Sequence, residues 1–235
     1  MTDFSDALQT ALLLLVNLDA GLIEIIALSL RVSLTAVAVA ALVGLPLGAL
    51  LAVSRFPTRR FWINLLNTFM GLPPVVVGLM VYLLLSRAGP LGPLGLLYTP
   101  VAMIIAQTLL ILPIIAALSC GVVQGLFDEY HEQLRSLGSR TLATARTLLW
   151  EGRFGLVTAI LAGFGRGNAE VGAVLIVGGN INHSTRVMTT TIALETSKGN
   201  LALALALGLI LILVSLLVAS AAQWLHTATM RRSRS

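Results

Sequence analysis

The sequence predicts an all-α, polytopic membrane protein. Of its 235 residues, 57% are hydrophobic and only 11% carry a charge, and the mean hydropathy is +0.95. A soluble globular domain carries about 25% charged residues, so this chain has too few to cover a surface exposed to water. Its hydrophobic residues also occur in long charge-free runs, and about 20 such residues cross a bilayer as a helix.

Five runs are long enough to span. They are residues 32–54, with a backward extension past Arg31 toward Leu22, and residues 61–86, 101–123, 154–177 and 201–224. Residues 7–16 are apolar but too short to cross, and we expect an interfacial or short surface helix there. Residues 88–100 are rich in Gly and Pro, which predicts a loop or re-entrant turn before the third span.

The basic residues predict the orientation, because Lys and Arg are enriched in cytoplasmic loops. Five spans place ten of them on one side, namely Arg55, Arg59, Arg60, Arg135, Arg140, Arg146, Arg153, Arg231, Arg232 and Arg234. Four lie on the other side, namely Arg31, Arg87, Arg186 and Lys198. The C-terminus is therefore predicted to be cytoplasmic and the N-terminus outside. The acidic start, MTDFSDALQT, predicts no cleavable signal.

Other classes of protein are disfavoured by residue usage. The pI is near 10.3, but the basic residues stand at segment ends instead of clustering with aromatic residues, which argues against nucleic-acid binding. The single cysteine, Cys120, excludes a disulfide framework or a cysteine metal site. Three scattered histidines imply no metal site.

The orientation makes residues 124–153 the one substantial cytoplasmic loop. Its composition predicts two short helices broken at Gly138. Apolar residues recur at spacings of three and four on the first of them, at Leu126, Phe127, Tyr130, Leu134 and Leu137. This apolar face either contacts a partner protein or lies on the membrane or on the chain's own helix ends. The predicted parts are 1–21, an extracytoplasmic segment, 22–225, the transmembrane domain, and 226–235, a basic tail.

At this loop the chain resembles the membrane subunits of bacterial binding-protein-dependent ABC importers. Their loop motif begins Glu-Ala-Ala and has Gly six positions after the Glu, the spacing of Glu132 and Gly138, although Gln133 and Leu134 replace the alanines. Two further stretches, LPPVVVG and FGRGNAEVGAVLIVGGNI, are similar to the molybdate, tungstate and sulfate branch. The segments LLWEGRF and TRVMTTTIALETSKGN are most similar to tungstate permeases.

The resemblance implies five core helices of the molybdate-permease (MetI-like) type and a homodimer with the pathway at its interface. A cytoplasmic ABC ATPase dimer and an extracytoplasmic oxyanion-binding protein complete such an importer. The chain has no G-x-x-x-x-G-K-[ST] phosphate loop, so we expect no cofactor on it and expect the partner ATPase to use ATP and Mg. The implied ATPase-coupling residues are Glu132, Arg135, Ser136, Leu137 and Gly138.

Arg166 and Glu170 are the only charges deep in a predicted span. Their spacing of four predicts that they share one helix face. Charges at this depth are costly and face the interior or water. They either line and gate the pathway, with Arg166 offsetting the charge of an anion and Glu170 preventing tight binding, or form an internal salt bridge that holds helices together.

Further pathway or gate candidates are hydroxyls, amides and backbone groups near the outer side. They are Asn168, Gly178, Gly179, Asn180, Thr189 and Thr190. The alternative is an ordinary polar loop that docks the binding protein. Gly-x-x-x-Gly spacings at Gly44 and Gly48 and at Gly163 and Gly167 predict close helix packing, either within the chain or between two copies.

Three other functions remain as rivals. A transporter driven by an ion gradient usually shows internal repeats and paired broken helices, and neither is visible here. A membrane enzyme needs a nucleophile with its base or an acidic metal cluster, which the sequence does not show. A membrane anchor leaves the charges at Arg166 and Glu170 without a role. Within the importer class, tungstate is the leading cargo, with molybdate and sulfate as alternatives.

Overall fold

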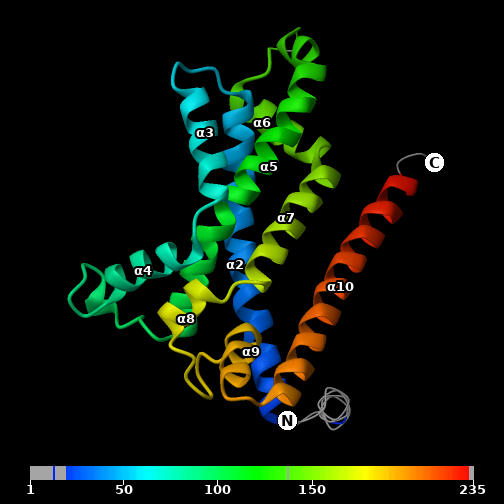
Figure 1. The fold of residues 1–235 in the computed structure, drawn as a ribbon. Helices are drawn as coiled ribbons and strands as arrows, with labels where there is room; N and C mark the ends of the chain where they lie inside the picture. Colours follow the sequence, from blue (N-terminus) through cyan, green and yellow to red (C-terminus); the bar gives the residue numbers. More distant parts are fainter. Residues whose placement is uncertain (1–12, 14–19, 137, 233–235) are drawn as a thin grey trace. The chain divides into compact units, whose positions relative to one another are not determined.

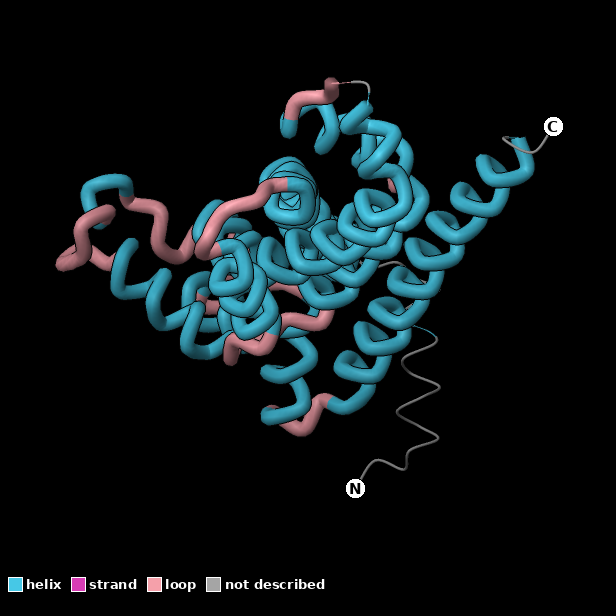
Figure 2. The backbone as a smooth tube through the Cα atoms, turned by 90° about the horizontal axis from the view of Figure 1, so that it is seen from above, coloured by secondary structure: helices cyan, strands magenta, loops and turns pink. Residues whose placement is uncertain are grey.

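The computed structural model describes residues 13, 20–136 and 138–232. Across this part of the chain the regular structure is helical and no strand occurs (Figures 1 and 2). The elements are α2 (Ala20–Val53), α3 (Arg59–Met70), α4 (Pro74–Leu85), the short 3-10 helix η1 (Gly92–Leu94), α5 (Pro100–Ser136), α6 (Thr141–Glu151), α7 (Arg153–Asn168), α8 (Gly172–Gly178), α9 (Met188–Ser197) and α10 (Leu201–Arg232). The predicted all-α class is confirmed.

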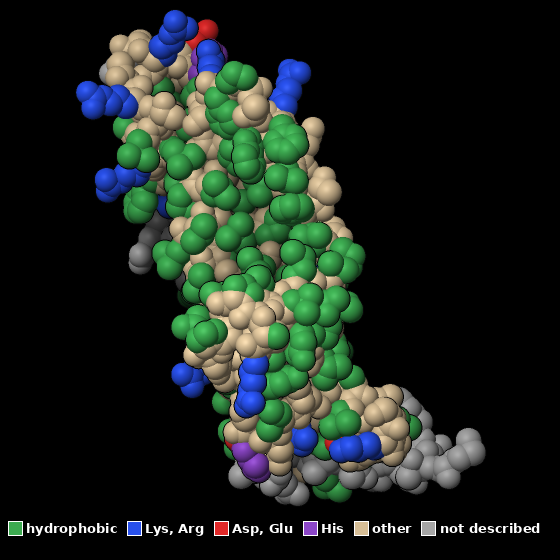
Figure 3. Space-filling model, turned by 90° about the vertical axis from the view of Figure 1, so that its left-hand side faces the viewer, with side chains coloured by type: hydrophobic (Ala, Val, Ile, Leu, Met, Phe, Trp, Pro, Cys, Tyr) green, Lys and Arg blue, Asp and Glu red, His purple; other side chains and the backbone are tan. Residues whose placement is uncertain are grey.

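Three helices are long and apolar enough to cross a membrane without interruption. They are α2, α5 and the part of α10 up to Ala221. Two bent helix pairs, α3 with α4 and α6 with α7, are together long and apolar enough as well, which gives up to five spans among the described residues. Figure 3 shows one face of the protein, where hydrophobic side chains cover much of the surface and charged side chains are few. Such a surface suits lipid.

The chain folds into two compact units, each built from segments far apart in the sequence. The first contains the start of α2 up to Thr35, then Pro74–Gln107 and Asn168–Ala221. In its core, Leu22 of α2 contacts Met188 of α9 and Leu207 and Ile210 of α10. In the same unit α4 and α8 approach closely, because a Cβ on Gly78 would lie 2.7 Å from the Cα of Ala173.

The second unit contains Ala36–Pro73, Thr108–Gly167 and the end of the chain from Ala222. Its core joins α2, α5 and α6 through the buried residues Ala49, Ala52, Val53, Cys120, Val123, Ala145 and Leu148. Three of the four glycines in the two predicted spacings lie in close helix contacts inside one chain. Gly44 and Gly48 lie against α5, and Gly163 of α7 lies against Ile111 and Ile115 of α5.

Two predicted spans are not single helices. The second, 61–86, ends at Met70 and restarts at Pro74, because Pro73 lacks an N–H and disfavours helical dihedrals at Leu72. Pro74 then suits the first position of α4. The fourth, 154–177, is broken between Asn168 and Gly172.

The predictions for the other spans and loops are partly confirmed. The first span is confirmed, including its extension past Arg31, and the fifth lies within α10. The third span continues without interruption to Ser136, so the first loop helix is part of α5 and is not separate as predicted. The loop at 88–100 is confirmed, with only η1 inside it. The predicted helix at 7–16 lies, apart from Leu13, outside the described residues.

Candidate functional site

The predicted coupling residues lie at the end of α5. Glu132, Arg135 and Ser136 are exposed on its last turns, and Gly138 is exposed just beyond it. Leu137 lies outside the described residues. Glu132 makes no ion pair within the described part of the chain. Its carboxylate, like the guanidinium of Arg135, is therefore available to a partner protein.

Gly138 ends α5 in the way the sequence predicts. Its φ is +64°, a left-handed conformation that side chains with a Cβ rarely adopt. The N–H of Gly138 donates to the carbonyl of Arg135, and the N–H of Ser139 donates to that of Leu134, each at 3.0 Å. This pair of bonds is the Schellman motif, which satisfies the last carbonyls of a helix. The turn from α5 into α6 is therefore set by a glycine.

The helix that follows the turn is held firmly on one face. Thr144, Ala145 and Leu148 of α6 are buried against the second unit. The hydroxyls of Ser139 and Thr144 lie 3.0 Å apart and tie the turn to the helix. On the opposite face, Leu142 keeps 72% of its surface exposed. The turn and the first turn of α6 thus form a rigid projection with an apolar tip.

Arg59 has a structural role that the sequence does not reveal. At the start of α3, its Nε donates to the carbonyl of Leu51 at 2.7 Å and its Nη2 donates to that of Ala52 at 3.1 Å. These are among the last carbonyls of α2, where a cation is favoured by the helix dipole. Nη2 also donates to Gln124, whose Nε2 donates to Asp128 at 2.7 Å. Arg59 therefore joins α2, α3 and α5.

The prediction that Arg166 and Glu170 share a helix face is wrong. Helix α7 ends at Asn168, so Glu170 lies in the break and the two belong to different units. The side chain of Glu170 is occupied: Oε1 accepts a hydrogen bond from the N–H of Ala173 at 3.0 Å. A carboxylate at this place satisfies a free N–H of the first turn of α8 and suits its dipole. Whether either residue lines a pathway stays a prediction.

Substitution of Glu170 tests this capping role. Glu170 is 4% exposed, so loss of its oxygen leaves a buried N–H without an acceptor. We expect Glu170→Ala to lower the free energy of unfolding by about 1–2 kcal/mol. Glu170→Gln keeps an oxygen acceptor and is expected to lose clearly less. Unfolding in mixed micelles measures both; equal losses would show that the charge matters and the acceptor geometry does not.

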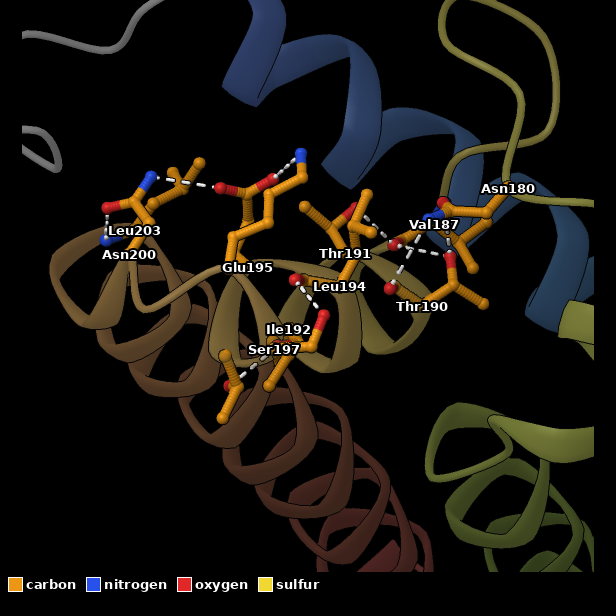
Figure 4. A network of polar contacts seen from close by, with 12 residues as sticks. Asn180, Val187, Thr190, Thr191, Ile192, Leu194, Glu195, Ser197, Asn200 and Leu203 are labelled. Carbon is orange, nitrogen blue, oxygen red and sulfur yellow. Dashed lines mark hydrogen bonds and ion pairs between the residues drawn. The ribbon is translucent and has the colours of Figure 1, made fainter.

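The remaining pathway candidates form a hydrogen-bonded cluster in the first unit. The hydroxyl of Thr190 donates to Oδ1 of Asn180 at 2.9 Å, and that of Thr189 donates to the carbonyl of Glu170 at 2.9 Å (Figure 4 shows Asn180 and Thr190). The hydroxyl of Thr185 donates to the carbonyl of Gly178. The cluster brings together five of the eight candidates, namely Glu170, Gly178, Asn180, Thr189 and Thr190.

Three candidates remain. Gly179 ends α8 with a φ of +68°, and a Cβ there would lie 2.9 Å from the ring of Tyr98. Asn168, also in the first unit, donates from Nδ2 to the hydroxyl of Ser215 at 2.8 Å. Arg166 is half-buried in the second unit, and its side chain or backbone interacts with another group. Most of the residues predicted to face cargo therefore already form hydrogen bonds within the chain.

Helix α9 was not predicted, since threonine is a weak helix former. Its threonine hydroxyls bond to the first turn: Thr191 donates to the carbonyl of Val187 at 2.7 Å, and Thr190 accepts from the N–H of Val187 at 3.2 Å (Figure 4). Ser29 of α2 accepts from the N–H of Met188 at 2.8 Å and so joins the helix to α2. The start of α9 is thus satisfied by side chains.

Glu195 closes the other end of α9 (Figure 4). Its Oε1 accepts from Lys198 Nζ at 2.9 Å and its Oε2 accepts from Asn200 Nδ2 at 2.9 Å. The hydrogen bond from Lys198, followed by that from Asn200, lowers the pKa of Glu195 below its ordinary value of 4.5. The ionised carboxylate is therefore favoured in the folded protein.

This lowered pKa predicts a pH dependence. Because the pKa is lower in the folded than in the unfolded chain, the stabilisation is present above about pH 4.5 and is lost as the pH falls through the folded pKa. We expect the thermal midpoint of the wild type to fall more steeply below this pH than that of Glu195→Gln. Parallel curves for the two proteins would contradict the assignment.

The described residues contain no candidate metal-binding site. Across residues 20–136 and 138–232, no three His, Cys, Asp or Glu side chains gather in a way that holds a metal ion. The fold and these sites define a multi-pass, all-α membrane protein with one rigid projection after its longest helix. The chain belongs to the family of binding-protein-dependent transport system inner membrane components, whose family model matches residues 44–231.

Individual relatives extend this comparison. A probable anion ABC transporter permease protein from Haloferax volcanii is 44% identical over 185 residues, which cover 77% of this chain and 80% of the relative. The tungstate uptake system permease protein TupB of Peptoclostridium acidaminophilum is 41% identical over 204 residues, or 87% and 90% of the two chains. TupB of Campylobacter jejuni is 40% identical over 197 residues, or 84% and 82%. Sulfate and molybdenum transport permeases also match, at 25 to 32% identity.

Proposed function

We propose that this chain is the membrane subunit of an ATP-driven importer and that its cargo is the oxyanion tungstate. The observation that carries the proposal is the identity of 40 to 41% with two proteins named as tungstate uptake permeases, over more than four-fifths of every chain compared. Permeases named for sulfate and molybdenum match at lower identity, which makes molybdate and sulfate the alternative cargoes.

The coupling role belongs to the projection formed by the end of α5, the turn at Gly138 and the start of α6. A partner ATPase transmits force through a contact that does not bend, and the Schellman turn with the buried face of α6 supplies this rigidity. The exposed side chains of Glu132, Arg135 and Leu142 supply charged and apolar contacts. ATP and Mg are bound by that partner, which forms a dimer, and an extracytoplasmic protein binds the oxyanion.

The same proposal sets the orientation and the assembly. The ten arginines predicted on one side of the spans support a projection and a C-terminus in the cytoplasm and an N-terminus outside a bacterial inner membrane. Helix α10 offers a surface for lipid or for a second copy, since large apolar residues such as Leu213, Leu216 and Leu217 remain 57 to 60% exposed. We propose that two copies enclose the pathway.

The pathway itself is proposed to be a passage of low affinity. An importer must release its cargo, and the hydroxyls and amides of Thr189, Thr190 and Asn180 are already bonded within the chain. They shape the wall of the passage more than they bind the anion. Selectivity for tungstate then resides mostly in the binding protein.

Transport of labelled oxyanions tests this function. The full chain is reconstituted in vesicles with its ATPase and binding protein, and uptake of labelled tungstate, molybdate and sulfate is measured with ATP, with a non-hydrolysable analogue, and with an ion gradient alone. We expect uptake only with ATP and strongest for tungstate. Uptake driven by the gradient without ATP would overturn the importer, and ATP-driven uptake of sulfate in preference to tungstate would overturn the cargo.

A further inference from the structure

The second unit has an open apolar groove that none of the roles above uses. It has a volume of about 750 Å³ and is lined by residues of α2, α6 and α7. Its floor and walls are aliphatic and include Leu42, Leu45 and Pro46 of α2 and Leu156 and Ile160 of α7. Leu42 is 77% exposed, so at least this wall has no cover in the described chain.

Two basic residues line the groove. Arg146 of α6 and Arg153 of α7 both line it, together with Trp150. Arg146 is exposed, and no carboxylate forms an ion pair with either arginine among the described residues. Glu151 is the acidic residue nearest to them in the sequence, and it does not line the groove. Among the described residues, the positive charge of the groove is therefore uncompensated.

Arg153 is held in a fixed orientation. Its guanidinium carbon lies 5.0 Å from the centre of the Trp150 ring and 4.4 Å from that of Phe154, and Nη1 donates to the carbonyl of Trp150 at 2.7 Å. Stacking on aromatic rings and one backbone bond fix the plane of the group. The remaining N–H donors of its fork suit the oxygens of a phosphate.

The apolar part of the groove extends away from this charge along α7. Helix α6 meets α7 at a bend of 79°, with Arg153 at the first position of α7. Ile160 follows seven residues later, which is about 10 Å along a helix. Trp150 is 71% exposed at the corner, and tryptophan is enriched where the membrane meets water. A lipid bound in this groove would have its head group beside the arginines and its acyl chain along the aliphatic residues.

We propose that this groove binds an anionic phospholipid, with the phosphate on Arg146 and Arg153 and one acyl chain along Leu42, Leu45 and Ile160. Basic pockets between membrane helices bind anionic lipid head groups in this way. A second copy of the chain is the alternative occupant, and the test below separates it from lipid. Assignment of the site to the cytoplasmic leaflet rests on the orientation proposed for the importer, but lipid binding itself does not.

Fluorescence of Trp150 tests the site. The full chain with Trp62→Phe and Trp224→Phe retains Trp150 as its only tryptophan. It is reconstituted in phosphatidylcholine vesicles that contain a minor fraction of brominated phosphatidylglycerol or brominated phosphatidylcholine, since bromine on the acyl chain quenches a neighbouring indole. We expect stronger quenching by phosphatidylglycerol. Arg146→Gln and Arg153→Gln are each expected to lower this preference about fivefold.

Arg60→Gln is the matched control, because it removes the same charge from an exposed position of the same unit outside the groove. It is expected to leave the preference unchanged. Arg146 is exposed and its substitution is expected to leave folding intact, so this variant remains informative if Arg153→Gln fails to fold. Equal quenching by the two lipids, a preference for phosphatidylglycerol that survives both substitutions, or no quenching at all would overturn the proposal; the last outcome would mean that protein fills the groove. The assay involves no transport, so failure of the importer assignment is seen separately.

Discussion

Replacement of Gly48 by alanine is expected to lower the free energy of unfolding by about 3 kcal/mol, because it forces a side chain into a contact between backbones. A Cβ on Gly48 would lie 2.3 Å from the carbonyl oxygen of Ala116 and 2.8 Å from the amide nitrogen of Cys120. These are atoms of α5 itself, so no side chain can rotate to make room. Helices α2 and α5 must then separate, and the contact around Ala49, Cys120 and Val123 opens with them.

Two other glycines provide the controls. A Cβ on Gly44 would meet Ile115 and Ala116 at 3.2 to 3.3 Å, so Gly44→Ala is expected to cost less than Gly48→Ala. Gly121 lies within α5 with nothing inside 4 Å, and Gly121→Ala is expected to be neutral or to stabilise the helix by up to about 1 kcal/mol. Unfolding in mixed micelles gives this order. Similar values for Gly48 and Gly121 would show that the close approach of α2 and α5 does not contribute to stability.

Replacement of Gly138 by valine is expected to uncouple ATP hydrolysis from uptake while the protein still folds and inserts. No atom lies within 4 Å of a Cβ at this position, so the effect is conformational and not a clash. A φ of +64° costs an L-residue about 1–2 kcal/mol. The correctly aimed projection then falls in population by about five- to thirtyfold, and uptake falls with it.

Asparagine tolerates the left-handed conformation, so Gly138→Asn is the matched control and is expected to transport almost as the wild type does. Labelled tungstate uptake and phosphate release are measured together in vesicles that contain the ATPase and the binding protein. We expect phosphate release to continue in Gly138→Val while uptake falls. Normal uptake by that variant would remove the coupling role from the turn.

The sequence predicts the helix break at Gly138 but not the one at Pro73. The sequence predicts a break at Gly138 because glycine there stands in an otherwise helix-forming loop, and a φ of +64° confirms it. No break is predicted at Pro73, because the prediction for residues 61–86 rests on apolar length, whereas two helices form there. Apolar length measures whether a segment prefers lipid, but helix continuity depends on backbone N–H groups that proline lacks.

Side-chain partners were harder to predict than helices. Spacing alone placed Glu170 on the face of Arg166, whereas the folded chain uses its carboxylate on Ala173 and its carbonyl on Thr189. In the sequence, Arg59 contributes only to the predicted orientation as a cytoplasmic charge. In the structure it hydrogen-bonds to α2 and to Gln124, which is 65 residues away. Neither target can be read from a local pattern, because folding brings it to the side chain.

The sequence by itself determined that this protein lies in the membrane, that it is all α-helical, and that Gly138 breaks the helices of the loop at 124–153. These are local properties, since the length and composition of one segment decide its transfer to lipid and the residue type decides its dihedrals. Only the tertiary structure decided which polar groups are already bonded, which glycines hold helices together, and where Arg146 and Arg153 meet an apolar groove. Those features depend on segments far apart in the chain, and their energies arise only once folding has removed water between them.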